Sequence, residues 1–250
     1  MNSTPIAGQV LARVALLVAS IFCYWLLRGT AFFQLTAGDG EGLNTLILLI
    51  GSIYAVMYAF VIYVIWGQFT DVEKFVMREC YTLDDLLRFS HYMDADSTRA
   101  IRRSVAEYSQ AVLQSEWQAL AERGTDLAAE KCFATLMMVV IRIAPANAEQ
   151  QAIQQRLIDI AREVGEHRDE RITKSLTRIP PTLMGFVHAV SVALAALVFV
   201  YPFRNPLTGS ACFGLIAALL LLANMVMTDL DNPFNGVYNV SSDPFSRLTR

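Results

Sequence analysis

The sequence has few of the residues from which catalytic and metal-binding sites are usually built. It contains only 3 histidines and 4 cysteines in 250 residues. The cysteines are isolated, with neither metal-ligand spacing nor a disulfide framework, so we expect them to be small buried apolar residues. The sequence also lacks a glycine-rich phosphate loop and any clear combination of serine, histidine and aspartate. These absences argue against an enzyme, and we expect no catalytic residue and no cofactor.

Charge is also scarce outside one central segment. Charged residues make up 17% of the chain, hydrophobic residues 54%, and the mean hydropathy is +0.40. Residues 67–179 hold 15 of the 20 Lys and Arg and 18 of the 23 Asp and Glu. This distribution is typical of a membrane protein with one soluble domain. The net charge of −3 and the lack of a basic stripe give no support for a nucleic-acid partner.

Four apolar runs predict four transmembrane helices. The first, residues 14–27, is only about 21 Å long as a helix, so a span of about 30 Å must continue past Arg28 toward Leu35. The second run is residues 43–66, the third 182–201, and the fourth 209–227. The predicted fold is an all-α membrane protein with four transmembrane helices and a helical cytoplasmic domain inserted between spans 2 and 3.

The chain divides accordingly into four segments. We expect spans 1 and 2 in residues 1–66, the cytoplasmic helical domain in 67–179, spans 3 and 4 in 180–228, and a cytoplasmic tail in 229–250. An even number of crossings puts both termini and the domain on one side of the membrane. Most Lys and Arg lie there, so that side is predicted to be cytoplasmic.

Sequence signals also predict the helices of the domain. The second span is expected to continue as a helix to residue 93. Asp94 supplies N-cap chemistry for a helix to residue 123, and Asn147 with Gln150 resembles a capping box for the last helix. Pro180 and Pro181 should break that helix at the membrane. No alternating strand pattern occurs. The charged residues 163–171 are expected to be solvated helix surface.

The second span carries a stripe of bulky residues at four-residue intervals. It consists of Ile50, Tyr54, Tyr58 and Ile62. The stripe is explained either by packing between helices or by a hydrophobic pore constriction, which gates by dewetting. The four-residue spacing favours packing between helices, and the pore constriction remains as the alternative interpretation.

Two ionisable side chains lie in or beside the spans, where such groups are functional candidates by default. Arg28 either snorkels to the membrane surface or faces protein or water. His188 is either a proton or anion site or a neutral imidazole hydrogen-bonded between helices. We keep both as anion-binding or gating candidates.

The segment after the last span is short, rigid and acidic. It contains Asp229 and the run Asp231, Asn232, Pro233, Phe234, Asn235 and Gly236. Asp229, Asp231 and Asp243 could bind a hard cation through oxygen ligands, but three acids spread over 15 residues are not a defined metal loop. We expect the segment to end the last span and to dock the tail onto the cytoplasmic helices.

Together these features resemble the bestrophin-like domain family, a group of mostly bacterial membrane proteins named for their similarity to bestrophin anion channels. Prokaryotic members have a similar acidic-x-Pro-Phe-Gly segment after the last span, whereas here Asn235 stands before the glycine. The other features that carry the resemblance are the uncharged second span leading into helix 71–79, Tyr108, Glu116, Trp117, the arginines 168, 171 and 178 before Pro180, and the two closing spans.

The resemblance implies a homo-oligomer, specifically a pentamer, in the bacterial inner membrane with lipid around it and a central pore for small anions. The second span would line the pore, with its neck among residues 50–62. Family members also carry an acidic calcium cluster after the last span, which is reduced here to Asp229 and Asp231. Two other interpretations remain open: a stator-type proton-channel subunit, and a membrane-anchored helical interaction protein without transport.

Overall fold

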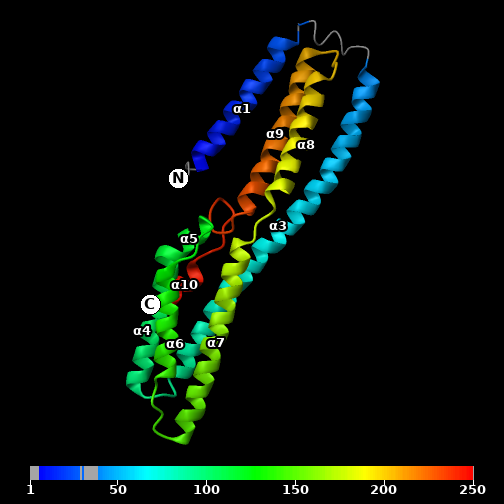
Figure 1. The fold of residues 1–250 in the computed structure, drawn as a ribbon. Helices are drawn as coiled ribbons and strands as arrows, with labels where there is room; N and C mark the ends of the chain where they lie inside the picture. Colours follow the sequence, from blue (N-terminus) through cyan, green and yellow to red (C-terminus); the bar gives the residue numbers. More distant parts are fainter. Residues whose placement is uncertain (1–5, 29, 31–38, 250) are drawn as a thin grey trace. The chain divides into compact units, whose positions relative to one another are not determined.

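The structure, a computed structural model, describes residues 6–28, 30 and 39–249, and within these ranges it contains helices and no strands (Figure 1). The predicted all-helical fold is therefore confirmed for this part of the chain. The helices, in chain order, are α1 (Ile6–Leu27), α3 (Gly40–Ser90), α4 (Ala95–Ala111), the π-helix η1 (Val112–Glu116), α5 (Trp117–Ala121), α6 (Leu127–Ile141), α7 (Ala148–Leu176), α8 (Pro181–Val200), α9 (Pro206–Leu230) and α10 (Asp243–Leu248).

Helix α3 is 51 residues long, or about 77 Å at 1.5 Å per residue. The first half of α3 contains the uncharged second apolar run, and the second half carries charged residues. The same helix therefore contributes to the apolar part of the chain and to the charged domain. The expected continuation beyond residue 66 is confirmed. The helix ends at Ser90, whose carbonyl accepts the backbone N–H of Met93 in a turn.

The predicted helix signals are confirmed at three points. The Asp94 side chain accepts the backbone N–H groups of Asp96 and Ser97 at the start of α4. The Asn147 side chain accepts the N–H of Gln150 at the start of α7. The last helix stops before Pro180, and α8 begins at Pro181. The expected single helix to residue 123 is wrong in one respect, because the π-helix η1 interrupts it.

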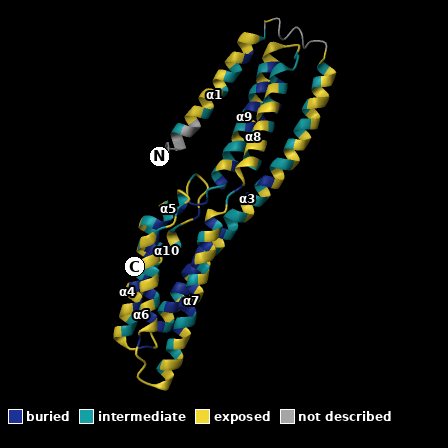
Figure 2. Cartoon of the chain, viewed as in Figure 1, coloured by how far each residue is buried: buried dark blue, intermediate teal, exposed yellow. Residues whose placement is uncertain are grey.

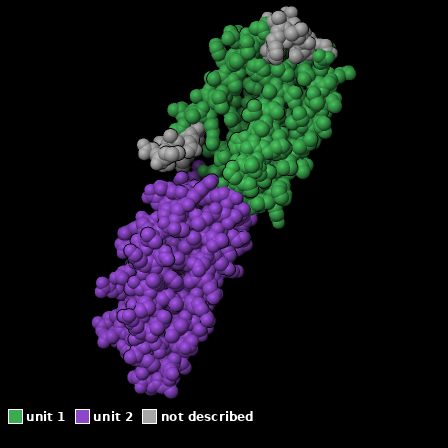
Figure 3. Space-filling view, in the orientation of Figure 1, with its two compact units in different colours: residues 1–65, 179–231 green, residues 66–178, 232–250 purple. Residues whose placement is uncertain are grey.

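The chain forms two compact units (Figure 3). Unit 1 comprises residues 1–65 and 179–231, and unit 2 comprises residues 66–178 and 232–250.

Unit 1 is apolar and exposes much of its apolar surface (Figure 2). Helix α9 packs against both α1 and α8. Tyr24 of α1 is fully buried there, stacked on Phe213 with 5.4 Å between ring centroids and edge-on to Phe199 at 5.5 Å. A water-soluble protein rarely exposes apolar patches of this extent, so the outer surface is suited to lipid.

Three described helical stretches are long and apolar enough to cross a membrane. They lie in α3, in the α7–α8 stretch and in α9. Within α1, residues 11–27 form a shorter apolar helix. The expected continuation of the first span toward Leu35 falls outside the described residues. The four-span layout therefore remains a prediction.

Unit 2 is a helical domain with a conventional apolar core. Helix α6 packs against α4 and α7, and α10 from the end of the chain packs against α4. Leu83, Leu136 and Leu157 are fully buried in the core. The tail residues Phe234 and Phe245 belong to the same core, so the end of the chain is an integral part of unit 2.

Candidate functional site

The acidic motif after α9 binds the backbone at a helix break. In unit 1, Asp231 Oδ1 accepts the N–H of Ile179 at 3.0 Å, which joins the end of α9 to the segment before α8. In unit 2, Asn232 Oδ1 accepts a bond from Arg178 Nη2 at 3.0 Å, and Asn232 Nδ2 donates to the carbonyl of Ala121 at 3.0 Å. Asp231 therefore fixes the segment before α8 within unit 1, and Asn232 binds the end of α5 within unit 2.

The rest of the motif turns the tail back onto unit 2. The Pro233 carbonyl accepts the N–H of Val240 at 2.8 Å, closing a loop in which Gly236 has φ of 120°, a conformation that favours glycine. The Phe234 ring is edge-on to Trp117, with 4.8 Å between centroids. The predicted docking of the tail onto the helices is confirmed, and its anchor is an aromatic contact.

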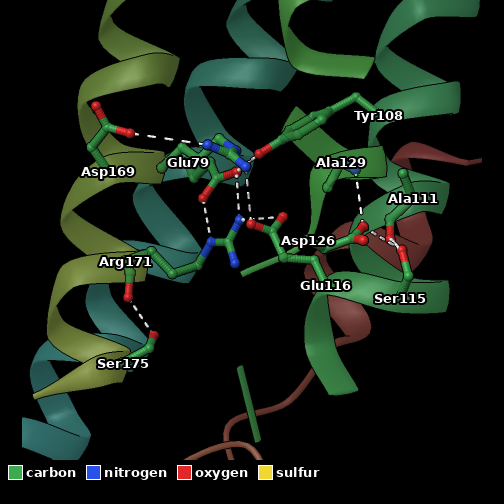
Figure 4. A network of polar contacts seen from close by, with 11 residues as sticks. Glu79, Tyr108, Ala111, Ser115, Glu116, Asp126, Ala129, Asp169, Arg171 and Ser175 are labelled. Carbon is green, nitrogen blue, oxygen red and sulfur yellow. Dashed lines mark hydrogen bonds and ion pairs between the residues drawn. The ribbon is translucent and has the colours of Figure 1, made fainter. Parts of the chain in front are cut away.

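A buried ionic network lies inside unit 2 (Figure 4). Glu79 of α3, Glu116 of η1 and Arg171 of α7 are all fully inaccessible to solvent. Arg171 Nε donates to Glu79 Oε2 at 2.6 Å, and Arg171 Nη2 lies 3.3 Å from both Glu79 Oε1 and Glu116 Oε2. Arg168 Nη2 donates to Glu116 Oε1 at 3.2 Å. Two carboxylates and two guanidinium groups thus neutralise each other, as buried charges require.

Two aromatic side chains also contact the charged groups of the network. The Tyr108 hydroxyl donates to Glu79 Oε1 at 2.5 Å, and the Arg171 guanidinium lies 5.5 Å from the ring centroid of Phe245 in the tail. Burial alone would lower the pKa of Arg171, but Glu79 and Glu116 raise it well above its usual value. Burial, followed by the Glu79 charge, raises the pKa of Tyr108 well above its usual value. Arg171 therefore stays protonated and the Tyr108 hydroxyl stays neutral at physiological pH.

The sequence interpretation missed this network. Arg168 and Arg171 were expected on a solvated surface, and for these two residues that expectation is wrong. A signal was present, because both continue the three- and four-residue spacing of the buried residues Leu157, Ala161 and Val164. The π-helix that ends at Glu116 had no comparable signal. Such insertions often occur at functional positions.

The predicted pore residues Ile50, Tyr54, Tyr58 and Ile62 are half-buried. The Tyr58 hydroxyl donates to the carbonyl of Ala223 in α9 at 3.0 Å, and the Tyr54 and Tyr58 rings stack with centroids 5.7 Å apart. These side chains therefore lie on the side of α3 that faces its own chain. Whether they line a pore stays a prediction.

The two ionisable candidates of unit 1 each bind a local partner. Arg28 donates to the Tyr24 hydroxyl and lies over the Tyr24 ring. His188 Nδ1 lies 2.7 Å from the carbonyl of Met184 in the same helix. A carbonyl only accepts, so Nδ1 carries the hydrogen. The structure thus gives His188 a bond within α8, and both the interhelical bond and the anion-binding or gating roles of the two residues stay predictions.

Within the described ranges, Asp229 and Asp231 are not joined by a third potential metal ligand. Among the residues that the structure describes, no group of three or more His, Cys, Asp or Glu side chains could hold a metal ion. The calcium role of the two aspartates thus stays a prediction with no added support.

Comparison with known proteins agrees with this architecture. Residues 14–245 match the Bestrophin-like domain. A bacterial bestrophin homolog from Klebsiella pneumoniae is similar in structure, with 12% identity, 96% of each chain covered and a TM-score of 0.73. A variant of that homolog gives 11% identity, 97% of each chain and a TM-score of 0.73. Another solved membrane protein gives 10% identity, 94% of this chain, 96% of its own and a TM-score of 0.72.

At these identities the structural likeness concerns the fold alone, and no protein with a curated function matches the sequence. The domain match, however, extends over nearly the whole chain, and apolar helices of membrane-spanning length lie within it. The protein therefore belongs to the bestrophin-like domain family of integral membrane proteins.

Proposed function

We propose that this protein is an oligomeric anion channel in which α3 lines the pore. Family membership supports the class of function, and the expectation of small anions and of a pentamer rests on that family resemblance. The observation that carries the proposal for this chain is an uncovered stripe of side chains on α3.

The stripe lies opposite the residues that face α9. It follows three- and four-residue spacing along α3 through Leu49, Ser52, Val56, Phe60 and Tyr63, which are all exposed. Val56 is 71% exposed and Phe60 58%, although a single helix in a bundle usually turns such residues inward. The other side of α3 is occupied by its own chain through the Tyr58 bond to Ala223. The stripe is thus the side of α3 available to a central axis.

We therefore propose that Val56 and Phe60, rather than the predicted Tyr54 and Tyr58, form the narrow part of the pore. Apolar side chains at a constriction exclude water and so oppose ion passage. Tyr54 and Tyr58 would lie on the opposite side of α3 from the pore and pack against the helix's own chain. The Ser52 hydroxyl donates to the Leu48 carbonyl at 2.7 Å, so it adds little polarity to the stripe.

The proposal includes four membrane crossings. Helix α1 has 22 residues, or about 33 Å, which matches a hydrocarbon core of about 30 Å. With α3, α8 and α9 this gives an even number of crossings, with both termini and the charged unit 2 on the cytoplasmic side. Helix α1 reaches the required length by extending toward Ile6, so the span includes Arg13 instead of Arg28.

The test is ion flux through purified protein reconstituted in planar bilayers. Wild type should pass chloride, and Val56→Ser should increase the current because a hydroxyl eases wetting of the constriction. Val192→Ser in α8 is the matched control, since Val192 is 69% exposed but lies on another helix. Absence of current from a folded oligomer would reject the channel. Equal currents from wild type and Val56→Ser would reject the stripe as the constriction.

A further inference from the structure

Polar side chains from three helices gather inside the apolar unit 1. Tyr54 and Tyr58 come from α3, Ser191 from α8 and Asn224 from α9. Asn224 Nδ2 donates to Ser191 Oγ at 3.0 Å and to the Leu220 carbonyl at 2.8 Å. Groups of this kind are uncommon within apolar spans, because each must find a partner where the surroundings offer none.

Two polar atoms of this group are buried and have no hydrogen-bond partner in the described chain. They are the Tyr54 hydroxyl oxygen and Asn224 Oδ1. The Tyr54 ring stacks on Tyr58, and the Tyr58 hydroxyl reaches Ala223, the residue before Asn224. Tyr54 and Asn224 are thus the immediate neighbours, by ring stacking and in sequence, of the two residues whose bond joins α3 to α9. Buried polar atoms are nearly always paired, so these two require an explanation.

The chemistry of the two atoms restricts what can bind them. The Asn224 amide cannot be turned around, because its oxygen would then face the Leu220 carbonyl, which is also an acceptor. A ligand must therefore donate a hydrogen to Asn224 Oδ1. The Tyr54 hydroxyl can donate or accept. An anion accepts only, so it cannot satisfy Asn224. A small neutral molecule that both donates and accepts fits the pair.

We propose that Tyr54 and Asn224 form a binding site for a water molecule between α3 and α9, with Ser191 fixing the asparagine. Water donates to Asn224 Oδ1 and bonds to the Tyr54 hydroxyl, which pairs both orphan atoms. The contact of α3 with α9 is consequently wet. Hydroxyl groups on α3 can exchange partners there without leaving a polar group unpaired in the membrane. This proposal does not depend on ion conduction.

The first test is the thermal stability of the full-length protein in detergent. Tyr54→Phe removes the hydroxyl and keeps the ring. If water pairs that hydroxyl, the variant loses a bond and leaves Asn224 less satisfied, so Tm should fall by a few degrees. If the hydroxyl is dry and unpaired, its removal should raise Tm. Tyr63→Phe is the control, because Tyr63 lies on the exposed side of α3 and its hydroxyl should not affect Tm.

The second test detects the water directly by X-ray radiolysis, in which bound water produces hydroxyl radicals that label adjacent side chains. Tyr54 should be labelled severalfold faster in the wild type than in Asn224→Leu, which replaces the second partner of the water by an apolar side chain of similar size. Equal labelling of Tyr54 in the two proteins would overturn the proposal, as would a raised Tm for Tyr54→Phe.

Discussion

Glu79→Gln should destabilise unit 2 strongly, because it removes one charge from a network that has no access to water. Glu79 receives two bonds from Arg171, at 2.6 and 3.3 Å, and one from Tyr108 at 2.5 Å. Removing one partner of a buried ion pair costs about 3–5 kcal/mol, mainly because the other charge remains buried. Glu116 still faces Arg171 at 3.3 Å, so we expect the lower end, about 3 kcal/mol.

The matched control is Glu107→Gln. Glu107 also accepts a bond from an arginine, Arg103, at 2.8 Å, but both side chains are largely exposed. Exposed pairs contribute about 0–1 kcal/mol, so this variant should be close to wild type. The same chemical change is thereby made in a buried and in a solvated pair.

Urea unfolding followed by tryptophan fluorescence provides the assay. Trp117 reports on unit 2 because it contacts the tail next to the network. Replacing Trp25 and Trp66 by phenylalanine in every sample leaves it as the only tryptophan. Equal unfolding midpoints for Glu79→Gln and Glu107→Gln would refute the view that the buried network supports unit 2.

Three further predictions address the tail, the apolar unit and the pH response. Phe234→Ala should cost about 3–5 kcal/mol of tail docking, seen as faster hydrogen exchange over residues 232–248; assembly should fail before ion preference changes. Gly209→Ala should lower the Tm in detergent by the equivalent of about 1–3 kcal/mol, because its methyl group would clash with the Tyr24 hydroxyl, whereas Gly185→Ala, with open space around it, should not. Hydroxyl and backbone N–H donors lower the pKa of Asp126 below its ordinary 3.8, so its contribution is present above that value and lost as pH falls through the folded pKa. The stability gap between wild type and Asp126→Asn should therefore stay constant from neutral pH down to about 3.8 and shrink as the pH falls further; a gap that stays constant below that value would contradict this.

Local signals in the sequence were sufficient for much of the fold. The caps at Asp94 and Asn147 and the break at Pro180 depend on residues a few positions away. The local sequence therefore contains all the partners involved. The docking role of the tail was also predictable from its motif. The end of α4 was not, because a π-helix depends on the packing of side chains from distant segments rather than on a local preference.

The candidate sites were predicted less well, and for a physical reason. Periodicity identified two faces of α3 but could not tell which face its own chain covers; the Tyr58 bond to Ala223, 165 residues away in the sequence, places the predicted stripe on the covered side. Similarly, Arg171 pairs with Glu79, which is 92 residues away in the sequence. A charged residue within a helix appears solvated unless its partner is known.

The sequence by itself determined the apolar and charged segments, the helices, the break before α8 and the family. Each of these depends on composition or on interactions between near neighbours. Only the tertiary structure decided that the arginines of α7 are buried, that the tail completes the core of unit 2, and that Val56 and Phe60 are on the uncovered side of α3. Those outcomes depend on which distant surfaces meet, and a pattern along one helix does not contain that information.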